Sequence, residues 1–266
     1  MYKSINDLPD VPFIYEENTT LAMHFDMGFI QSVMRKDNPD HLVLGYTRAM
    51  MGFLFFQPKP VRIALIGMGG GSLAKYCLKH LPDAHFTAIE VNEKVIALRN
   101  KFRIPSDSDQ FKVLHANGAD YVANPGEQVD VLLIDGFNEQ GHPESLCSEN
   151  FYTDCYEKLC DDGVVAVNLL ASDPEHGTYI SRLCNSFGNK VVVVDVENTT
   201  NKIAFAYKGN HFPIPEATLM ARIEHLGTEH PIPLQTTGQK ILRFSRGSLS
   251  HCDLHDEGVV SKVGLI

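Results

Sequence analysis

The chain has 266 residues, of which 44% are hydrophobic, and this is enough apolar material for one sizeable core with a small appendage. The formal net charge of −10, without a cluster of lysine and arginine, argues against a nucleic-acid surface, and no apolar run approaches the length of a membrane span. The first residues lack the apolar region of a signal peptide, so we expect a cytoplasmic protein with no nucleic-acid or membrane partner.

Residues 1–58 predict a small N-terminal β element followed by a connecting helix. Two alternating runs, 21–26 and 29–34, flank a short glycine turn, which is typical of a β-hairpin. Residues 37–57 predict a helix with a proline in its first turn and a very apolar end. That end is too short to span a bilayer, so we expect it to pack against the sheet, and we interpret Tyr46 as a packing residue.

Residues 59–209 alternate between predicted strands and helices. The predicted strands are 61–66, 85–91, 110–115, 129–135, 163–170, 190–196 and 202–208. The predicted helices are 72–81, 93–102, 117–123, 148–160 and 175–187. Continuous apolar strands imply a sheet that is covered on both faces, so the sequence predicts an α/β fold with a doubly wound, mostly parallel, seven-stranded Rossmann-like sheet. Residues 210–266 predict a C-terminal extension with one or two helices and an irregular tail.

The first strand, helix and second strand of this domain indicate a nucleoside site. The strand ends in a glycine cluster, Gly67, Gly69, Gly70 and Gly71, and Glu90 closes the next strand 19 residues after Gly71. Glycines let a ligand approach the main chain, and an acid at this spacing is typical of a residue that binds ribose hydroxyls. The glycine spacing departs from the dinucleotide fingerprint, which disfavours an NAD-dependent oxidoreductase and favours a mononucleoside such as S-adenosylmethionine.

Further polar residues follow the later strands, where the carboxyl ends of a parallel sheet face a ligand. Asn117 follows the third strand, and we expect it near a base edge. Asp135 closes the fourth strand, and Asn138 and Glu139 come directly after it. The six cysteines show none of the spacings of zinc sites, so we expect no metal.

Several motifs in the same order resemble the spermidine synthase (polyamine aminopropyltransferase) family over about residues 10–208. The matching segments are 25–31 (FDMGFIQ), 66–71 (IGMGGG), 89–91 (IEV), 135–138 (DGFN) and 143–152 (PESLCSENFY). The resemblance implies a small N-terminal β domain, a Rossmann domain of the class I methyltransferase type and a homodimer. It also implies decarboxylated S-adenosylmethionine as the aminopropyl donor and a polyamine as the small-molecule acceptor.

The resemblance also assigns roles to single residues. Gln31 matches a family residue near the nucleoside, and Glu90 matches the acid that holds the ribose hydroxyls. Asp135 matches the first acid of the D-x-x-D active-site motif. The residues nearest the expected acceptor path are then Asp135, Asn138 and Glu139.

Three family acids are neutral in this chain, at Gly70, Asn117 and Asn138. An amide at position 138 cannot take a proton from an attacking amine, which makes standard aminopropyl transfer to polyamines doubtful. A glycine at position 70 removes a charge that would repel the carboxylate of intact S-adenosylmethionine, so we expect that donor to bind at least as well as its decarboxylated form. The sequence therefore predicts a spermidine-synthase-like transferase. Two alternatives stay open, an S-adenosylmethionine-dependent methyltransferase and a non-catalytic nucleoside-binding protein.

Overall fold

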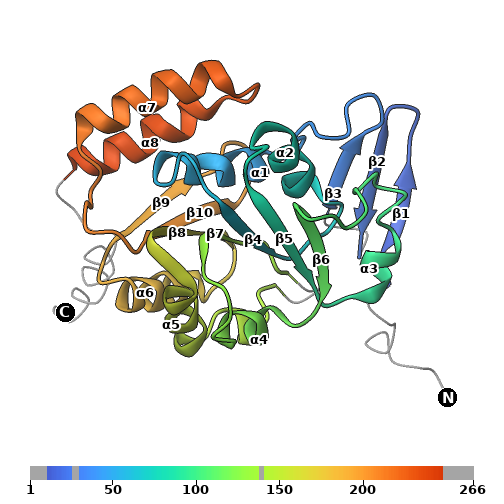
Figure 1. Ribbon diagram of the computed structural model, residues 1–266, viewed down its shortest axis with the longest axis horizontal. Helices are drawn as coiled ribbons and strands as arrows, with labels where there is room; N and C mark the ends of the chain where they lie inside the picture. The colour runs from blue at the N-terminus through green and yellow to red at the C-terminus, as the bar shows by residue number, and fades with distance from the viewer. Residues whose placement is uncertain (1–10, 26–29, 138–140, 248–266) are drawn as a thin grey trace, which may run out of the picture.

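The computed structural model describes residues 11–25, 30–137 and 141–247. A small antiparallel sheet at the N-terminal end lies beside a seven-stranded sheet that has helices on both faces (Figure 1). The predicted α/β class and the mostly parallel seven-stranded sheet are confirmed. Within these residues no helix has the length and apolarity that crossing a membrane requires.

The N-terminal sheet has three strands in sequence order. They are β1 (Phe13–Glu16), β2 (Thr20–His24) and β3 (Ile30–Arg35). The predicted hairpin is present as the antiparallel pair of β2 and β3, and its turn, residues 26–29, lies outside the described residues. The sequence analysis did not predict β1, whose side chains are mostly exposed. Met23 and Met34 are buried and join the core of the main domain, so this sheet packs onto the rest of the molecule.

The connection between the two sheets is helical only in its second half. The helical elements are α1 (Gly45–Met50) and the 3₁₀ helix η2 (Met51–Phe55). The prediction of a helix from residue 37 is therefore wrong for residues 37–44. The guanidinium of Arg48 donates to the main-chain carbonyls of Leu42 and Val43 at 2.7 and 2.6 Å, which holds the preceding chain in a non-helical course. The apolar end of this segment is buried as expected.

The seven-stranded sheet has the order β6-β5-β4-β7-β8-β10-β9, in which β10 is antiparallel to both of its neighbours and the first five strands are parallel. The strands are β4 (Arg62–Ile66), β5 (His85–Glu90), β6 (Phe111–His115), β7 (Val129–Ile134), β8 (Leu159–Leu170), β9 (Val191–Asp195) and β10 (Asn201–Tyr207). All seven were predicted, although β8 begins at Leu159 and not at residue 163.

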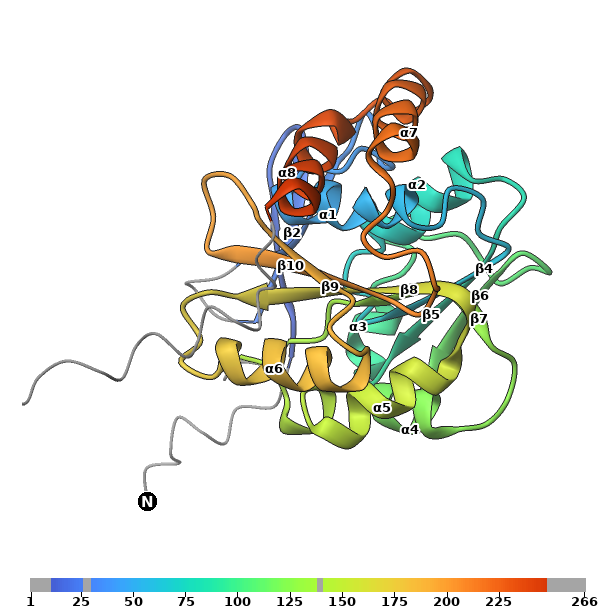
Figure 2. The ribbon, with the colours of Figure 1, turned by 90° about the vertical axis from the view of Figure 1, so that its left-hand side faces the viewer.

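Helices cover both faces of this sheet (Figure 2). They are α2 (Ser72–His80), α3 (Glu93–Ala97), α4 (Gly118–Ala123), η3 (Glu144–Leu146), α5 (Glu149–Lys158) and α6 (His176–Ser186). Alternate residues of β4 enter two different cores. Ile63 and Leu65 pack with α1, η2, α2 and α3, whereas Ala64 and Ile66 pack with α4, α5 and α6. The helix predicted over residues 93–102 is shorter than expected, because α3 ends at Ala97 and turns follow.

The C-terminal segment contains two helices, α7 (Glu216–Glu229) and α8 (Leu234–Arg246), which pack side by side above η2 and β9 (Figure 1). Leu219 and Leu242 belong to the same buried core as the sheet residues Phe86 and Phe205. The predicted irregular tail, residues 248–266, lies outside the described residues. The division of the chain at 58/59 and at 209/210 stays a prediction.

Candidate functional site

The strand order reverses between β4 and β7, and doubly wound sheets bind ligands at such a point. Here the glycine loop after β4 packs directly against the end of β7. Gly67 has a φ of +90°, and a Cβ on this residue would lie 2.2 Å from the main-chain oxygen of Asp135. The main-chain N–H of Asp135 in turn donates to the oxygen of Ile66 at 2.8 Å. A residue with a side chain would push the two strand ends apart, so this approach requires glycine.

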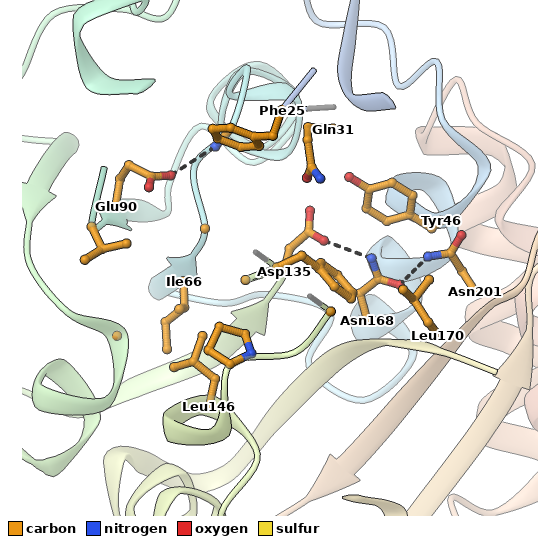
Figure 3. Close-up of a pocket in the computed structure, with 18 of the residues that line it drawn as sticks. Phe25, Gln31, Tyr46, Ile66, Glu90, Asp135, Leu146, Asn168, Leu170 and Asn201 are labelled. Carbon is orange, nitrogen blue, oxygen red and sulfur yellow. Dashed lines mark hydrogen bonds between the residues drawn. The ribbon is translucent and has the colours of Figure 1, made fainter. Parts of the chain in front are cut away.

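Glu90 closes β5 beside the same loop and is 8% exposed. Its Oε2 accepts hydrogen bonds from the main-chain N–H groups of Met68 at 3.0 Å and Gly69 at 3.4 Å, and its Oε1 accepts one from Asn92 at 3.0 Å. The carboxylate therefore holds the glycine loop in place and also lines the cavity described next. Figure 3 shows Glu90 on the opposite side of this cavity from Tyr46.

A cavity of about 870 Å³ opens along the carboxyl ends of the parallel strands. Sites for small molecules typically have volumes of roughly 300–1,000 Å³, so this one is large enough for a nucleoside together with a second small molecule. Its described lining comes from the N-terminal sheet through Phe25 and Gln31, from α1 through Tyr46, and from the residues that follow β4 to β8 (Figure 3). The small sheet therefore forms one wall of the site.

A chain of hydrogen bonds crosses the floor of this cavity. Asn201 donates its amide N–H to Oδ1 of Asn168 at 2.9 Å, and Asn168 donates to Oδ1 of Asp135 at 2.9 Å. The hydroxyl of Tyr46 lies near the Asp135 carboxylate and lowers the pKa of that group. In Figure 3 the side chains of Gln31, Tyr46 and Asp135 point toward the same space. The amide of Asn168, itself held by Asn201, therefore orients the Asp135 carboxylate.

The surroundings of Asp135 change its acidity. Burial raises the pKa of Asp135 from its ordinary value of 3.8 to about 7, although the hydrogen bond from Asn168 and the nearby hydroxyl of Tyr46 act in the opposite direction. Burial and the adjacent carboxylate also raise the pKa of the Tyr46 hydroxyl well above its ordinary value, so Tyr46 acts as a donor at neutral pH. A carboxyl group with a pKa near 7 can both bind a cation and exchange a proton at the pH of a cell.

The described lining of the cavity has a negative charge. Glu90, Asp135 and Asp173 contribute carboxyl groups, and none of the lining residues in the described part of the chain is a lysine, arginine or histidine. Across the described ranges, we find no group of three or more histidine, cysteine, aspartate or glutamate side chains that could hold a metal. The charge of the lining matches a positively charged organic molecule.

The structure brings together most residues that the sequence analysis assigned to the nucleoside. The cavity is lined by Gln31, Gly67, Gly69, Glu90, Asn117 and Asp135. Gly70 and Gly71 belong to the same loop but are not among the lining residues. Asn138 and Glu139, predicted near the acceptor, lie outside the described residues. The binding and catalytic roles of all these residues stay predictions.

Gly70 and Asn117 occupy positions with specific local roles. A Cβ on Gly70 would lie 2.5 Å from the Ser32 hydroxyl and 2.8 Å from the ring of Phe102, so the space beside the main chain is already filled. Asn117 lines the cavity, but its Oδ1 accepts the N–H of Ala119 at 2.8 Å and caps α4. Its amide oxygen is therefore used for the fold, which leaves the amide nitrogen as the group available to a base edge.

Several polar residues of the site were not predicted from the sequence. Asn168 and Asn201 lie within or at the start of apolar strands, and Tyr46 was interpreted as a packing residue. Tyr46 nevertheless lines the cavity, and Figure 3 shows its hydroxyl pointing into the same space as Asp135. The available signal was a single polar amide or hydroxyl in otherwise apolar sequence, because such a group needs a hydrogen-bond partner when it is buried.

Comparison with known proteins gives consistent matches. A model of the spermine/spermidine synthase domain matches residues 43–218. A polyamine aminopropyltransferase of Neisseria meningitidis is 36% identical over 199 residues, which cover 74% of this chain and 76% of that protein. A solved structure from Corynebacterium glutamicum, described as a probable spermidine synthase, has a TM-score of 0.67 at 15% identity and covers 96% of this chain and 95% of its own. A spermidine synthase in complex with the transition-state analogue AdoDATO has a TM-score of 0.57 at 21% identity, with 74% and 73% covered. At these identities the two solved structures show a common fold.

Proposed function

This chain belongs to the spermine/spermidine synthase family, and we propose that it transfers the aminopropyl group of decarboxylated S-adenosylmethionine to an aliphatic amine of the polyamine class. The observation that carries the proposal is the Asp135 carboxyl group, which has a pKa of about 7 and lies at the strand crossover in a cavity lined by carboxyl groups. Both proposed substrates are cations, and a negatively charged cavity favours them. The name of the Neisseria relative, polyamine aminopropyltransferase, supports the same reaction.

The reaction makes one bond to nitrogen and breaks one bond to sulfur. The neutral amine nitrogen attacks the carbon beside the sulfonium, the C–S bond electrons return to sulfur, and methylthioadenosine leaves as a neutral molecule. Because the amine is protonated in water, a base has to accept its proton before attack. In the proposal the Asp135 carboxylate binds the ammonium and then accepts its proton. Tyr46 and Asn168 hold the carboxylate in position.

The sequence argument against this reaction depended on the amide at position 138, which lies outside the described residues. Asp135 provides a carboxyl group for the same proton transfer. Its raised pKa brings it closer to the pKa of an amine than an exposed aspartate would be. Proton transfer from the amine is therefore less unfavourable than it would be to an exposed aspartate.

A second candidate is methyl transfer from intact S-adenosylmethionine, and the observation that favours it is Gly70. The family's acid at this position is absent, and Ser32 and Phe102 occupy the space into which a side chain would extend. A cavity of about 20 Å³ beside Gly69 is lined by the hydroxyl residues Ser32, Thr47 and Ser72 on one side, and Asp135 is the one acid among its described lining residues. With glycine at position 70, Asp135 is the one acid in this described lining that would repel the carboxylate of an intact donor.

Titration calorimetry with the two donors, followed by mass analysis of the amine product, separates these candidates. The glycine at position 70 led to the expectation that intact S-adenosylmethionine binds at least as well. The proposal reverses it: we expect decarboxylated S-adenosylmethionine to bind more tightly, because the carboxylate of the intact donor would enter a cavity that already holds Asp135. We also expect the product amine to carry an aminopropyl group. Equal or tighter binding of intact S-adenosylmethionine, with a methylated product, would instead support methyl transfer. Binding without any product from a panel of amines would support the non-catalytic alternative.

Replacing Glu90 tests the position of the nucleoside. We expect Glu90→Ala to weaken the binding of methylthioadenosine by about 1–3 kcal/mol, because the ribose hydroxyls would lose a charged acceptor. Glu90→Gln, which keeps one oxygen acceptor for the glycine loop, is the matched variant and should lose less. Calorimetry measures the affinity of both variants for methylthioadenosine, and circular dichroism checks that both variants still fold. Unchanged affinity in Glu90→Ala would place the ribose elsewhere.

Two further expectations complete the proposal. The homodimer and the cytoplasmic location predicted from the sequence stay predictions. Light scattering on the purified protein measures the mass in solution, and a mass equal to that of one chain would contradict the dimer.

A further inference from the structure

The glycine loop after β4 has few side chains with which to hold its own conformation. Residues 69–71 are three consecutive glycines, and glycine has more conformational freedom to lose than any other residue. Two buried side chains from the segment after α3 pack against them. A Cβ on Gly70 would lie 2.8 Å from the ring of Phe102, and one on Gly71 would lie 2.6 Å from Ile104. The order of the loop therefore depends on this segment.

Lys75 joins α2 to the segment that supports the loop, residues 98–104. Its Nζ donates a hydrogen bond to the main-chain oxygen of Phe102 at 2.7 Å, and the residue is 6% exposed. Among the described residues this is the only hydrogen bond between α2 and the supporting segment. A charged donor makes a stronger hydrogen bond than a neutral one. Lys75 therefore holds the segment at the residue whose ring supports Gly70.

A lysine is a costly residue at this buried position. Burial lowers the pKa of Lys75 to about 8, while the charge of Asp40 acts in the opposite direction and that of Arg103 lowers the pKa further. The ammonium group is still mostly charged at pH 7, where an apolar side chain of similar length would carry no such desolvation cost. A buried charge of this kind contributes little to the free energy of folding, so we expect its effect at the loop that it supports.

The supported loop faces the cavity, whereas its support does not. Gly69 lines the cavity and, together with Met68, donates its main-chain N–H to the Glu90 carboxylate. Lys75 and Phe102 are not among the described lining residues. A displacement of the supporting segment therefore reaches a bound molecule through the glycine loop and Glu90.

We propose that Lys75 is a positioning residue for the donor nucleoside, which acts by holding Phe102 against Gly70 and so fixing the glycine loop. The inference rests on the proposed function for the identity of the donor, and it assigns to Lys75 a role without contact to either substrate. The proposed function places the acceptor amine at Asp135, at the end of β7. The effect of Lys75 should therefore be confined to ligands that contain the nucleoside.

Lys75→Met, compared with Lys158→Met, tests this assignment. Lys158 is a matched control, because it is 5% exposed and its Nζ donates to the main-chain oxygen of Asn124 at 3.0 Å. It lies at the amino end of β8, away from the cavity lining. Calorimetry with methylthioadenosine should give a dissociation constant about 10-fold higher for Lys75→Met and within about two-fold of the unaltered protein for Lys158→Met, because small displacements in a positioned site are costly. Equal affinity of the two variants would overturn the assignment.

Steady-state kinetics distinguish positioning from a general loss of structure. In Lys75→Met we expect KM for decarboxylated S-adenosylmethionine to rise about 10-fold, while kcat and the KM for putrescine stay within about two-fold. Lys75→Arg, which retains a charged N–H donor, should recover most of the affinity for methylthioadenosine. A lower kcat with an unchanged donor KM, or an arginine variant that binds as weakly as the methionine variant, contradicts the positioning role.

Phe102→Leu tests the contact through which Lys75 acts, and it remains informative if Lys75→Met does not fold. The leucine keeps the main-chain oxygen and shortens the side chain that packs against Gly70, so affinity for methylthioadenosine should fall here as well. Because both changes act through one segment, the double variant should bind about as weakly as the weaker single variant. Unchanged affinity in Phe102→Leu, or effects that multiply in the double variant, would show that Lys75 does not act through Phe102.

The proposed function and the role of Lys75 can fail separately. If the unaltered protein binds methylthioadenosine but transfers no aminopropyl group to any amine, the proposed function is wrong, and the calorimetric comparison of Lys75→Met with Lys158→Met still decides the positioning role. If the unaltered protein does not bind methylthioadenosine, both are wrong.

Discussion

Replacing Asp135 by asparagine should lower kcat by about 10²- to 10⁴-fold, the contribution typical of a positioned general base. The amide has nearly the shape of the carboxylate and keeps an oxygen, so the hydrogen bond from Asn168 can be kept. It can neither carry a negative charge to bind the ammonium nor accept its proton. The expected result is a folded protein that binds the nucleoside and transfers almost no aminopropyl group.

Two measurements distinguish this result from simple loss of structure. Calorimetry with methylthioadenosine should give an affinity close to that of the unaltered protein. The pH dependence of kcat/KM in the unaltered protein should rise through about 7 as Asp135 loses its proton, and the variant should lack this inflection. Wild-type rates in Asp135→Asn would show that another group takes the proton.

The same substitution, Asp135→Asn, lowers kcat but should not lower the free energy of unfolding at high pH. The pKa of Asp135 is about 7 in the folded protein and 3.8 ordinarily, so between these values the folded state binds more protons than the unfolded state. The stabilisation from this group is fully present below pH 3.8 and is lost as the pH rises through about 7. Denaturant unfolding at pH 8 should therefore find Asp135→Asn at least as stable as the unaltered protein, whereas at pH 5 this advantage should be smaller or absent. The residue is thus expected to favour activity at the expense of stability.

Replacing Gly67 by alanine should weaken donor binding by about 100-fold. The new Cβ would lie 2.2 Å from the oxygen and 2.7 Å from the carbonyl carbon of Asp135, and both are main-chain atoms that cannot rotate away. The ends of β4 and β7 would have to separate, and a displacement of about 1 Å in a positioned site can cost 10²-fold. The φ of +90° adds strain of about 1–3 kcal/mol.

Gly188→Ala is the matched control for the backbone strain. This glycine also has a positive φ, +58°, but a Cβ there would meet no atom within 4 Å, and it lies at the end of α6 away from the cavity lining. We expect it to lose stability without losing affinity for the donor. Calorimetry measures the affinity of both variants for the donor, and thermal unfolding measures their stability. Equal affinity in Gly67→Ala and Gly188→Ala would show that the approach of the two strand ends is not needed for binding.

The main sheet could be predicted from local patterns. Runs such as residues 131–134 are apolar without interruption, and only a strand that is covered on both faces buries every residue of such a run. Glycine and polar residues mark the end of each run, so the strand ends were located with errors of a few residues. The cluster Gly67 to Gly71 and the acid Glu90 then identified the edge of the sheet where a ligand binds.

The segments that were mispredicted depend on contacts with distant residues. Residues 37–44 have a sequence that is compatible with a helix. The guanidinium of Arg48 donates hydrogen bonds to main-chain carbonyls of this segment and holds it in a non-helical conformation. Strand β1 is only four residues long and mostly exposed, so its pattern was weak, and it forms because β2 offers an edge with which it pairs. Propensity and periodicity carry no information on either partner.

The same distinction applies to the site. Glu90 and Asp135 close strands, and the rule that carboxyl ends meet at one edge places them together. Tyr46, Asn168 and Asp173 reach the cavity from α1, from within β8 and from the loop after it. No spacing along the chain relates these three to Asp135, so they became visible only when the sheet order was known.

By itself the sequence determined the class of fold, the order of the strands along the chain and the two acids at the strand ends, because hydrophobic burial and glycine conformation act over a few neighbouring residues. The tertiary structure decided how these acids behave. The pKa of Asp135 depends on its burial and on the side chains of Asn168 in β8 and Tyr46 in α1, which come from distant parts of the chain. Solvent exclusion and hydrogen bonding between distant segments set the acidity and charge of a site, and these exist only after the chain has folded.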